Sequence, residues 1–171
     1  MTHTDTPQTL CRAAVAQGDI TPPVGIYHRL WGAAAHDRAT AVHRPLLATL
    51  LWLEPQEGPR DQQQLIVALD HCILDGDEIA RIANAVSEVV PLTVEQVHIT
   101  LSHTHGSGWM SRSRAAFPGG ELIGPYLEGL TQTIATLAQE AHGRIRPASI
   151  VYGQGRCNLA AHRDYWDADR A

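Results

Sequence analysis

Two histidines stand two positions apart in the segment LSHTHGSGW (101–109), directly after an apolar run. On a β-strand, side chains two positions apart point to the same face, so His103 and His105 would present two imidazoles together. Imidazole nitrogen is a preferred ligand of Zn²⁺. The spacing therefore predicts one edge of a zinc site. The alternative is that both residues belong to a loop and that hydrogen bonds hold their rings.

The segments around these histidines predict a strand–helix–strand unit. The apolar segments QLIVALD (64–70) and VHITL (97–101) are typical of buried strands. Between them, apolar residues recur at helical spacing over 75–90, and Asp75 with Glu78 approximates a capping box at the start of that helix. A strand, a helix and a strand in this order indicate a βαβ unit with two parallel strands.

Parallel strands place their carboxyl ends at the same edge of a sheet, where ligands bind in open α/β folds. The first strand ends at Asp70 and His71, and the second leads into His103 and His105. We therefore expect the two segments to lie close together, with Asp70 orienting a zinc-bound imidazole through a hydrogen bond. Alternatively, Asp70 caps the turn that follows it. For His71, a purely structural role is the favoured interpretation.

The rest of the chain predicts one mixed α/β domain. We expect a flexible tail at 1–10 and a single α/β domain over 11–171, with a mixed, partly parallel sheet and flanking helices, as part of a larger layered domain. Its further elements are strands at 11–20, 46–54 and 148–155 and a helix at 121–142 with an apolar stripe of Ile123, Leu127, Leu130, Ile134, Leu137 and Ala141. The continuous apolar runs favour strands buried on both faces. The small and polar residues of 106–120 indicate a long loop.

Composition argues against several classes of function. The chain has 171 residues, a formal net charge of −5 and 5% aromatic residues, so we expect no nucleic-acid partner. Cys11, Cys72 and Cys157 form no C-x-x-C pair, which favours reduced thiols over disulfides or a zinc knuckle. With neither a signal peptide nor a membrane-spanning apolar stretch in the sequence, we expect a cytoplasmic protein. The aromatic residues Tyr165 and Trp166 near the end suggest that the polypeptide continues.

Five segments in order carry a resemblance to a known family. They are GDITPPVG (18–25), RATAVHRPLLATLLWLE (38–54), VALD (67–70), LSHTHGSG (101–108) and YGQGRCNLAAHRDYW (152–166). Together they resemble the N-terminal part of the catalytic domain of the neutral/alkaline non-lysosomal ceramidases. The resemblance implies a zinc-dependent amidase that hydrolyses the N-acyl bond of ceramide, releasing a sphingoid base and a fatty acid.

The resemblance also implies roles for individual residues. His103 and His105 belong to the zinc site; we favour His103 as the direct ligand and His105 as a second imidazole that handles protons or substrate. His43 matches a histidine near the active site, and Arg163 matches an arginine that contacts substrate or the developing oxyanion. Ser107 is expected to offer a loop hydroxyl to the substrate and not to act as a nucleophile, because no nucleophile elbow surrounds it.

The sequence departs from the family pattern at two places. Gly106 and Ser107 are transposed relative to the family's H-T-H-S-G, and His162-Arg163 replaces its N-R. The family's other zinc ligands would lie beyond residue 171, so the resemblance implies that this chain carries only part of the zinc site. Two alternatives remain open: a hydrolase of the same fold that acts on a soluble amide, and a non-catalytic α/β binding domain.

Overall fold

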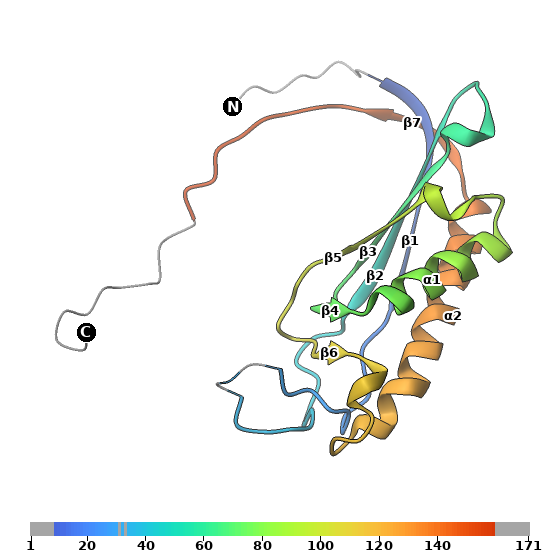
Figure 1. The fold of residues 1–171 in the computed structure, drawn as a ribbon. Coiled ribbons are helices and arrows are strands. Elements are labelled where there is room, and N and C mark those ends of the chain that lie inside the picture. The colour runs from blue at the N-terminus through green and yellow to red at the C-terminus, as the bar shows by residue number, and fades with distance from the viewer. Residues whose placement is uncertain (1–8, 31, 33, 160–171) are drawn as a thin grey trace.

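A computed structural model describes residues 9–30, 32 and 34–159 of the chain. Its main sheet has five strands in the order β5-β3-β2-β1-β7 (Figure 1). The strands are β1 (Thr9–Asp19), β2 (Leu47–Pro55), β3 (Gln64–Leu69), β5 (Val97–Leu101) and β7 (Arg146–Ile150). Only β3 and β5 are parallel, and every other pair in this sheet is antiparallel. The mixed, partly parallel sheet predicted from the sequence is confirmed.

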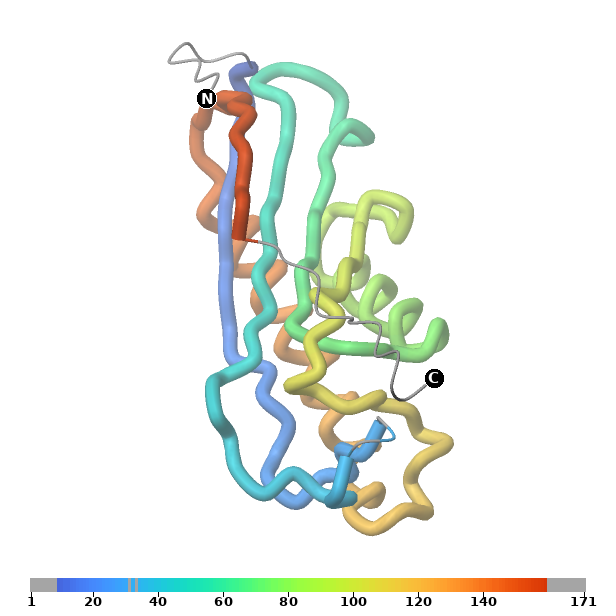
Figure 2. Tube along the Cα trace, turned by 90° about the vertical axis from the view of Figure 1, so that its left-hand side faces the viewer, coloured from blue at the N-terminus to red at the C-terminus, as the bar shows by residue number. Residues whose placement is uncertain are grey.

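Two helices cover one face of this sheet. Helix α1 (Gly76–Val89) connects the parallel strands β3 and β5, which confirms the βαβ unit, and α2 (Ile123–His142) lies beside it (Figure 1). Figure 2 views the sheet from its opposite face, which no described helix covers. The fold is therefore a sheet with one helical layer over the part of the chain that the structure describes.

Burial along the central strands follows this one-sided arrangement. In β2 as far as Trp52, and throughout β3, every second residue is buried, while the residues between them are half-buried or exposed. The prediction that these strands are buried on both faces is therefore wrong for the described residues. The buried side chains meet the apolar stripe of α2, all six of whose predicted members are buried. Trp52 of β2, for example, contacts the ring of His142 at a centroid distance of 5.0 Å.

The predicted capping box at the start of α1 is not formed. Asp75 is the residue preceding the helix, but its side chain makes no capping hydrogen bond. Its Oδ1 instead accepts a hydrogen bond from Trp109 Nε1 (2.9 Å), and the buried Glu78 accepts one from Arg112 Nε (2.7 Å). Both acidic side chains thus hold the segment after β5, because tertiary partners compete with the local cap.

The segment 106–120 is more ordered than the long loop predicted from its composition. It contains β6 (Trp109–Met110), which pairs in parallel with β4 (Ile73–Leu74), and the short 3₁₀ turns η3 (Arg112–Arg114) and η4 (Gly120–Leu122). Gly119 has φ +86°, and a Cβ there would lie 2.1 Å from the carbonyl oxygen of Gly25. Only glycine permits this close approach. The segment is therefore fixed against both the β4 region and the chain near Gly25.

The ends of some elements differ from the predictions. Strand β1 begins at Thr9, so the last two residues of the predicted tail belong to the sheet. Strand β7 ends at Ile150, before the predicted end at 155. None of the helices in the described ranges is long and apolar enough to cross a membrane.

Candidate metal centre

The parallel pair β3/β5 brings the two predicted site segments together. Directly after the last residue of β5, Ser102 N donates a hydrogen bond to the carbonyl oxygen of Leu69, the last residue of β3 (3.0 Å). Farther along the same two segments, His103 Nδ1 lies 3.2 Å from the carbonyl oxygen of Cys72 and 3.8 Å from its Sγ. The structure thus places the segment after Leu69 beside the H-T-H segment, as expected from parallel strands.

Three side chains at this edge could hold a metal ion. One ligand atom each from Cys72, His103 and His105 lies within 4.8 Å of the other two. The two imidazole rings meet edge to face, with centroids 5.6 Å apart and an interplanar angle of 68°. Cys72 is buried, whereas both histidines are exposed. Sulfur and imidazole nitrogen are ligands that Zn²⁺ prefers, so this donor set fits the metal implied by the resemblance.

The histidines reach this arrangement by a route that the spacing did not predict. Strand β5 ends at Leu101, and His103 has φ +54°, the left-handed region that residues other than glycine seldom adopt. The residues after it turn back, with Ser107 N donating to Thr104 O (3.4 Å). The two rings therefore converge through a turn, and the expectation that both lie on one strand face is wrong.

A second set of side chains at the same edge is sealed in the protein. His71 is 0% exposed and Ser107 is 1% exposed. Ser107 Oγ lies 2.8 Å from His71 Nδ1, while His71 Nε2 contacts the hydroxyl of Tyr126. That hydroxyl donates to Ile20 O (2.7 Å). These three side chains, His71, Ser107 and Tyr126, are called the buried network below.

The proton positions in the buried network follow from its acceptors. The carbonyl of Ile20 only accepts, so the single proton of Tyr126 is used there and His71 Nε2 must donate to the Tyr126 oxygen. Burial lowers the pKa of His71 to about 4 despite the nearby charge of Asp70, so its Nδ1 carries no proton and accepts from Ser107, whose hydroxyl also lies 3.1 Å from the carbonyl oxygen of Gly108. Burial also raises the pKa of the Tyr126 hydroxyl. The structural role favoured for His71 agrees with this geometry.

A cavity of about 480 Å³ lies next to the H-T-H turn. Thr104 and Gly106, which flank His105 in sequence, line it together with His43 and Asp70. Asp70 Oδ2 accepts a hydrogen bond from Leu47 N (3.1 Å), which joins the end of β3 to the start of β2. Asp70 thus has a backbone partner and stands outside the three-residue donor group. Its predicted action on an imidazole remains a prediction.

The other site residues predicted from the sequence do not share one location. His43 is exposed and lines the cavity, and the active-site role implied for it remains a prediction. Ser107 is not a lining residue, because its hydroxyl faces His71. Arg163 lies outside the described residues. Its predicted contact with the oxyanion remains a prediction.

Sequence reasoning missed Cys72 and two cavity histidines. Cys72 was interpreted only as a reduced thiol, although its place just after β3 put it at the same edge as the H-T-H segment. His28 and His36 both line the cavity and stack with ring centroids 6.2 Å apart. His28 Nε2 also lies 3.3 Å from Gly106 O, which connects this pair to the H-T-H turn. The only signal for them was the high number of histidines.

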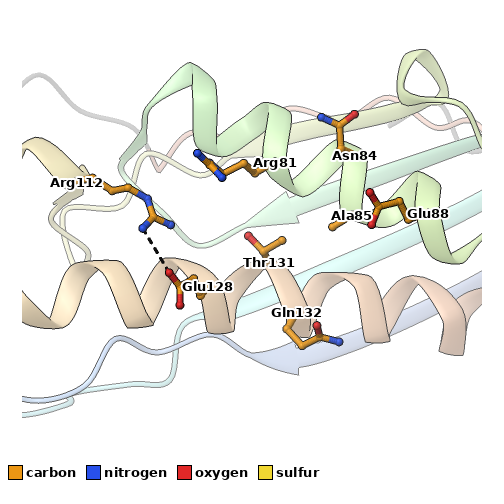
Figure 3. A pocket seen from close by; sticks show the side chains of 8 residues that line it. All are labelled: Arg81, Asn84, Ala85, Glu88, Arg112, Glu128, Thr131 and Gln132. Atoms are coloured by element: carbon orange, nitrogen blue, oxygen red, sulfur yellow. Dashed lines mark ion pairs between the residues drawn. The ribbon is translucent and has the colours of Figure 1, made fainter.

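A further cavity, of about 470 Å³, lies between α1 and α2. Figure 3 shows Arg81 and Asn84 of α1 on one side and Glu128 of α2 on the other, with Arg112 paired to Glu128 at 3.5 Å. None of the site residues predicted from the sequence lines this cavity. It lies over the helical layer and away from the strand ends, so we do not assign the predicted chemistry to it.

Comparison with known proteins supports the fold. The sequence matches no protein-family model and no curated protein sequence. A crystal structure of neutral ceramidase from Pseudomonas aeruginosa is similar over 84% of this chain, with a TM-score of 0.64 and 16% identity. A structure of a ceramidase complexed with C2 is similar over the same share, with a TM-score of 0.62 and 15% identity. This chain spans only 23% and 22% of those two chains. The chain therefore has a neutral-ceramidase-like α/β fold, as the resemblance in sequence implied.

Proposed function

We propose that the protein is a zinc-dependent amide hydrolase of the ceramidase type, which cleaves an N-acylsphingosine into a sphingoid base and a fatty acid. The observation that carries the proposal is the convergence of Cys72, His103 and His105 within 4.8 Å in a ceramidase-like fold. This group lies where β3 and β5 end, which is the edge at which α/β sheets bind ligands. The donor types match the metal that the proposed reaction needs.

His103 is proposed as the residue that holds the metal. A zinc ion bound there would supply a Lewis acid for the amide carbonyl and a bound water of lowered pKa. His105 lies close enough to act either as a second ligand or as the acid that protonates the leaving amine. Arg163 is proposed to stabilise the negative charge that develops on the carbonyl oxygen.

The cavity beside the H-T-H turn is proposed as the place where the amide group binds. Its volume of about 480 Å³ is within the usual range for small-molecule sites. Thr104 and Gly106 connect its wall directly to His105, and His43 brings an exposed imidazole to the same space. A substrate amide in this cavity would lie beside the turn that carries the donor residues, although none of Cys72, His103 and His105 lines the cavity itself. Asp70 and His43 are among the polar groups available to orient it.

The test combines metal analysis with hydrolysis assays on the purified protein. Zinc content and fatty-acid release from N-acylsphingosine are measured for the unchanged protein, for His103→Ala and for His98→Ala. His98 is an exposed histidine of β5 bound to Gln64 Oε1, so it is a matched control outside the site. We expect His103→Ala to lose both zinc and hydrolysis and His98→Ala to retain both. Full hydrolysis by zinc-free protein, or by His103→Ala, would refute the proposal.

The same assay distinguishes the substrate class. Short, water-soluble N-acyl amines are compared with N-acylsphingosine at matched concentration. Faster turnover of the lipid amide supports the ceramidase type. Turnover of the short amides alone would instead identify a hydrolase of the same fold that acts on soluble compounds. Bound zinc without hydrolysis of either class would favour a non-catalytic binding domain.

A further inference from the structure

We propose that His28 is a positioning residue for the hydrolysis, which holds the H-T-H turn in place through the carbonyl of Gly106. The inference deepens the proposed function and rests on it for the reaction itself. His28 belongs to residues 26–37, a stretch that none of the five segments resembling the ceramidases includes, so no role for it follows from the resemblance. Its ring lines the cavity, between the turn and the space proposed for the substrate amide.

The ring of His28 reaches the residue that directly follows His105. Its Nε2 lies 3.3 Å from the carbonyl oxygen of Gly106. A carbonyl oxygen only accepts, so Nε2 carries a proton and donates this hydrogen bond. The bond holds the peptide between Gly106 and Ser107 from the cavity side. The hydroxyl of Ser107, in contact with His71, holds the same peptide from the interior.

The turn depends on such outside partners because its own hydrogen bonds are long. Ser107 N donates to Thr104 O over 3.4 Å, and Gly106 N donates to Thr104 Oγ1 over 3.2 Å. These lengths lie at or beyond the upper end of the usual range for N–H···O hydrogen bonds. His103, at the start of the turn, also has φ +54°. A weakly closed turn of this kind keeps its shape only with support from the surrounding chain.

The backbone around His28 is in close contact with the segment after the turn. A Cβ on Gly108 would lie 3.0 Å from the carbonyl oxygen of His28 and 3.2 Å from its Cα, so a larger residue at 108 would push the two segments apart. Farther along, Arg114 Nη1 donates a hydrogen bond to Arg29 O (2.9 Å). Two contacts besides that of the ring therefore fix the distance between residue 28 and the turn.

Further contacts support His28 on the side away from the turn. His28 N donates a hydrogen bond to Asp37 O (2.7 Å), and Asp37 Oδ1 pairs with Arg29 Nη1 (3.3 Å). The ring of His36 stacks nearly parallel to that of His28, with centroids 6.2 Å apart and an interplanar angle of 9°. The ring of His28 is therefore held between His36 and Gly106. A residue that is itself fixed in this way can hold a reacting group within the narrow tolerance that catalysis needs.

Kinetic constants distinguish positioning from direct contact with substrate. A residue that only contacts substrate contributes mainly to KM, whereas a residue that places His105 contributes to kcat. A displacement of a reacting group by about 1 Å can cost about a hundredfold in rate. His28→Phe keeps a planar ring but has no donor. We expect it to lower kcat for N-acyl amide hydrolysis by about ten- to a hundredfold and to change KM by less than about threefold.

The experiment combines these kinetics with hydrogen exchange of the metal-free protein. Backbone amides of residues 104–107 should exchange several times faster in His28→Phe than in the unchanged protein, while those of α2 exchange at the same rate in both. His28→Gln, whose amide offers an N–H at a similar reach, should restore both kcat and slow exchange. His98→Phe, the same change at an exposed histidine of β5, should alter neither quantity.

Three other results would refute the positioning role. The first is a rise in KM alone with unchanged exchange at 104–107, which would mean that His28 contacts substrate directly. The second is a failure of His28→Gln to restore kcat. The third needs no variant: ¹⁵N NMR of the unchanged protein would show a neutral His28 ring with its proton on Nδ1 instead of Nε2. If no form of the protein hydrolyses an N-acyl amide, the proposed function fails, while hydrogen exchange still shows whether His28 holds the turn.

Discussion

The candidate metal centre and the buried network share the same two chain segments, yet they differ in exposure and in bonding. His71 and Cys72 are adjacent in sequence, but His71 joins the buried network while Cys72 approaches the histidines of the metal centre. Similarly, the exposed His105 lies two positions before the buried Ser107. Each segment therefore contributes one residue to stability and a near neighbour to the candidate site.

The difference between the two groups shows that neighbouring residues can serve two roles, a candidate role in metal binding and a role in stabilising the fold. In the buried network every proton has an assigned acceptor, and the pKa of His71 keeps its ring neutral at physiological pH. In the metal centre, sulfur and nitrogen donor atoms converge within 4.8 Å at the protein surface. We infer that the first group rigidifies the turn on which the second depends. Substitutions should therefore affect the two groups in opposite ways.

The largest expected effect is on catalysis and falls on the metal centre. We expect His103→Ala to lower kcat/KM for N-acyl amide hydrolysis by at least about a thousandfold, because it removes a proposed metal ligand. The free energy of unfolding in the presence of a chelator should change by less than about 1 kcal/mol, since the side chain is exposed. Steady-state kinetics and urea denaturation measure the two quantities. A large loss of stability without loss of activity would contradict the assignment of activity to the metal centre and of stability to the buried network.

The second-largest expected effect is the pH dependence of the free energy of unfolding, which we assign to His71 of the buried network. The pKa of His71 is lowered from 6.5 to about 4, so as the pH falls the unfolded chain takes up this proton before the folded protein does. Stability from this group is complete above pH 6.5 and is lost as the pH falls to about 4. This difference in the pKa of His71 between the unfolded and the folded chain corresponds to about 3 kcal/mol in the free energy of unfolding.

Urea denaturation of metal-free protein at a series of pH values measures this loss. His71→Gln should be less stable at neutral pH and should show a flatter decline between pH 6.5 and 4. His98→Ala, which changes an exposed histidine, should follow the unchanged protein. An identical decline in His71→Gln and in the unchanged protein would mean that His71 is not the group responsible.

A smaller effect is expected when one hydroxyl is removed from the buried network. Tyr126→Phe leaves His71 Nε2–H and the Ile20 carbonyl without their shared partner, at a cost of about 2 kcal/mol in the free energy of unfolding. The affinity for Co²⁺ should change by less than about tenfold, because no donor atom is lost. His103→Ala should show the reverse, with metal binding lost and stability nearly unchanged. If both variants lose metal binding equally, the two groups are not separable.

The sequence predicted the fold better than it predicted the site. The apolar periods of β3, α1 and β5 were enough to predict that the segments after Leu69 and Leu101 meet at one edge, because the parallel strands of a βαβ unit end on the same side of the sheet. The capping box failed because Asp75 and Glu78 bond to Trp109 and Arg112, which are distant in sequence. Such competition between local and tertiary hydrogen-bond partners cannot be detected in the sequence around the helix start.

The site was less predictable because its geometry depends on very short elements. The H-T-H spacing suggested a strand, but the left-handed conformation of His103 turns the chain directly after β5. Cys72 reaches the histidines because β4 and β6, each only two residues long, hold the segment after it. Two-residue strands have no detectable period. The residue types at the sheet edge were thus predictable, whereas the donor set required coordinates.

The central claim, a zinc ion bound at His103, is tested most directly by zinc K-edge X-ray absorption of the zinc-loaded protein. The account predicts imidazole nitrogen among the neighbours of the zinc, at about 2.0–2.1 Å. His103→Ala treated in the same way should retain no bound zinc. Zinc without imidazole neighbours in the unchanged protein, or zinc retained in full by His103→Ala, would contradict the metal site.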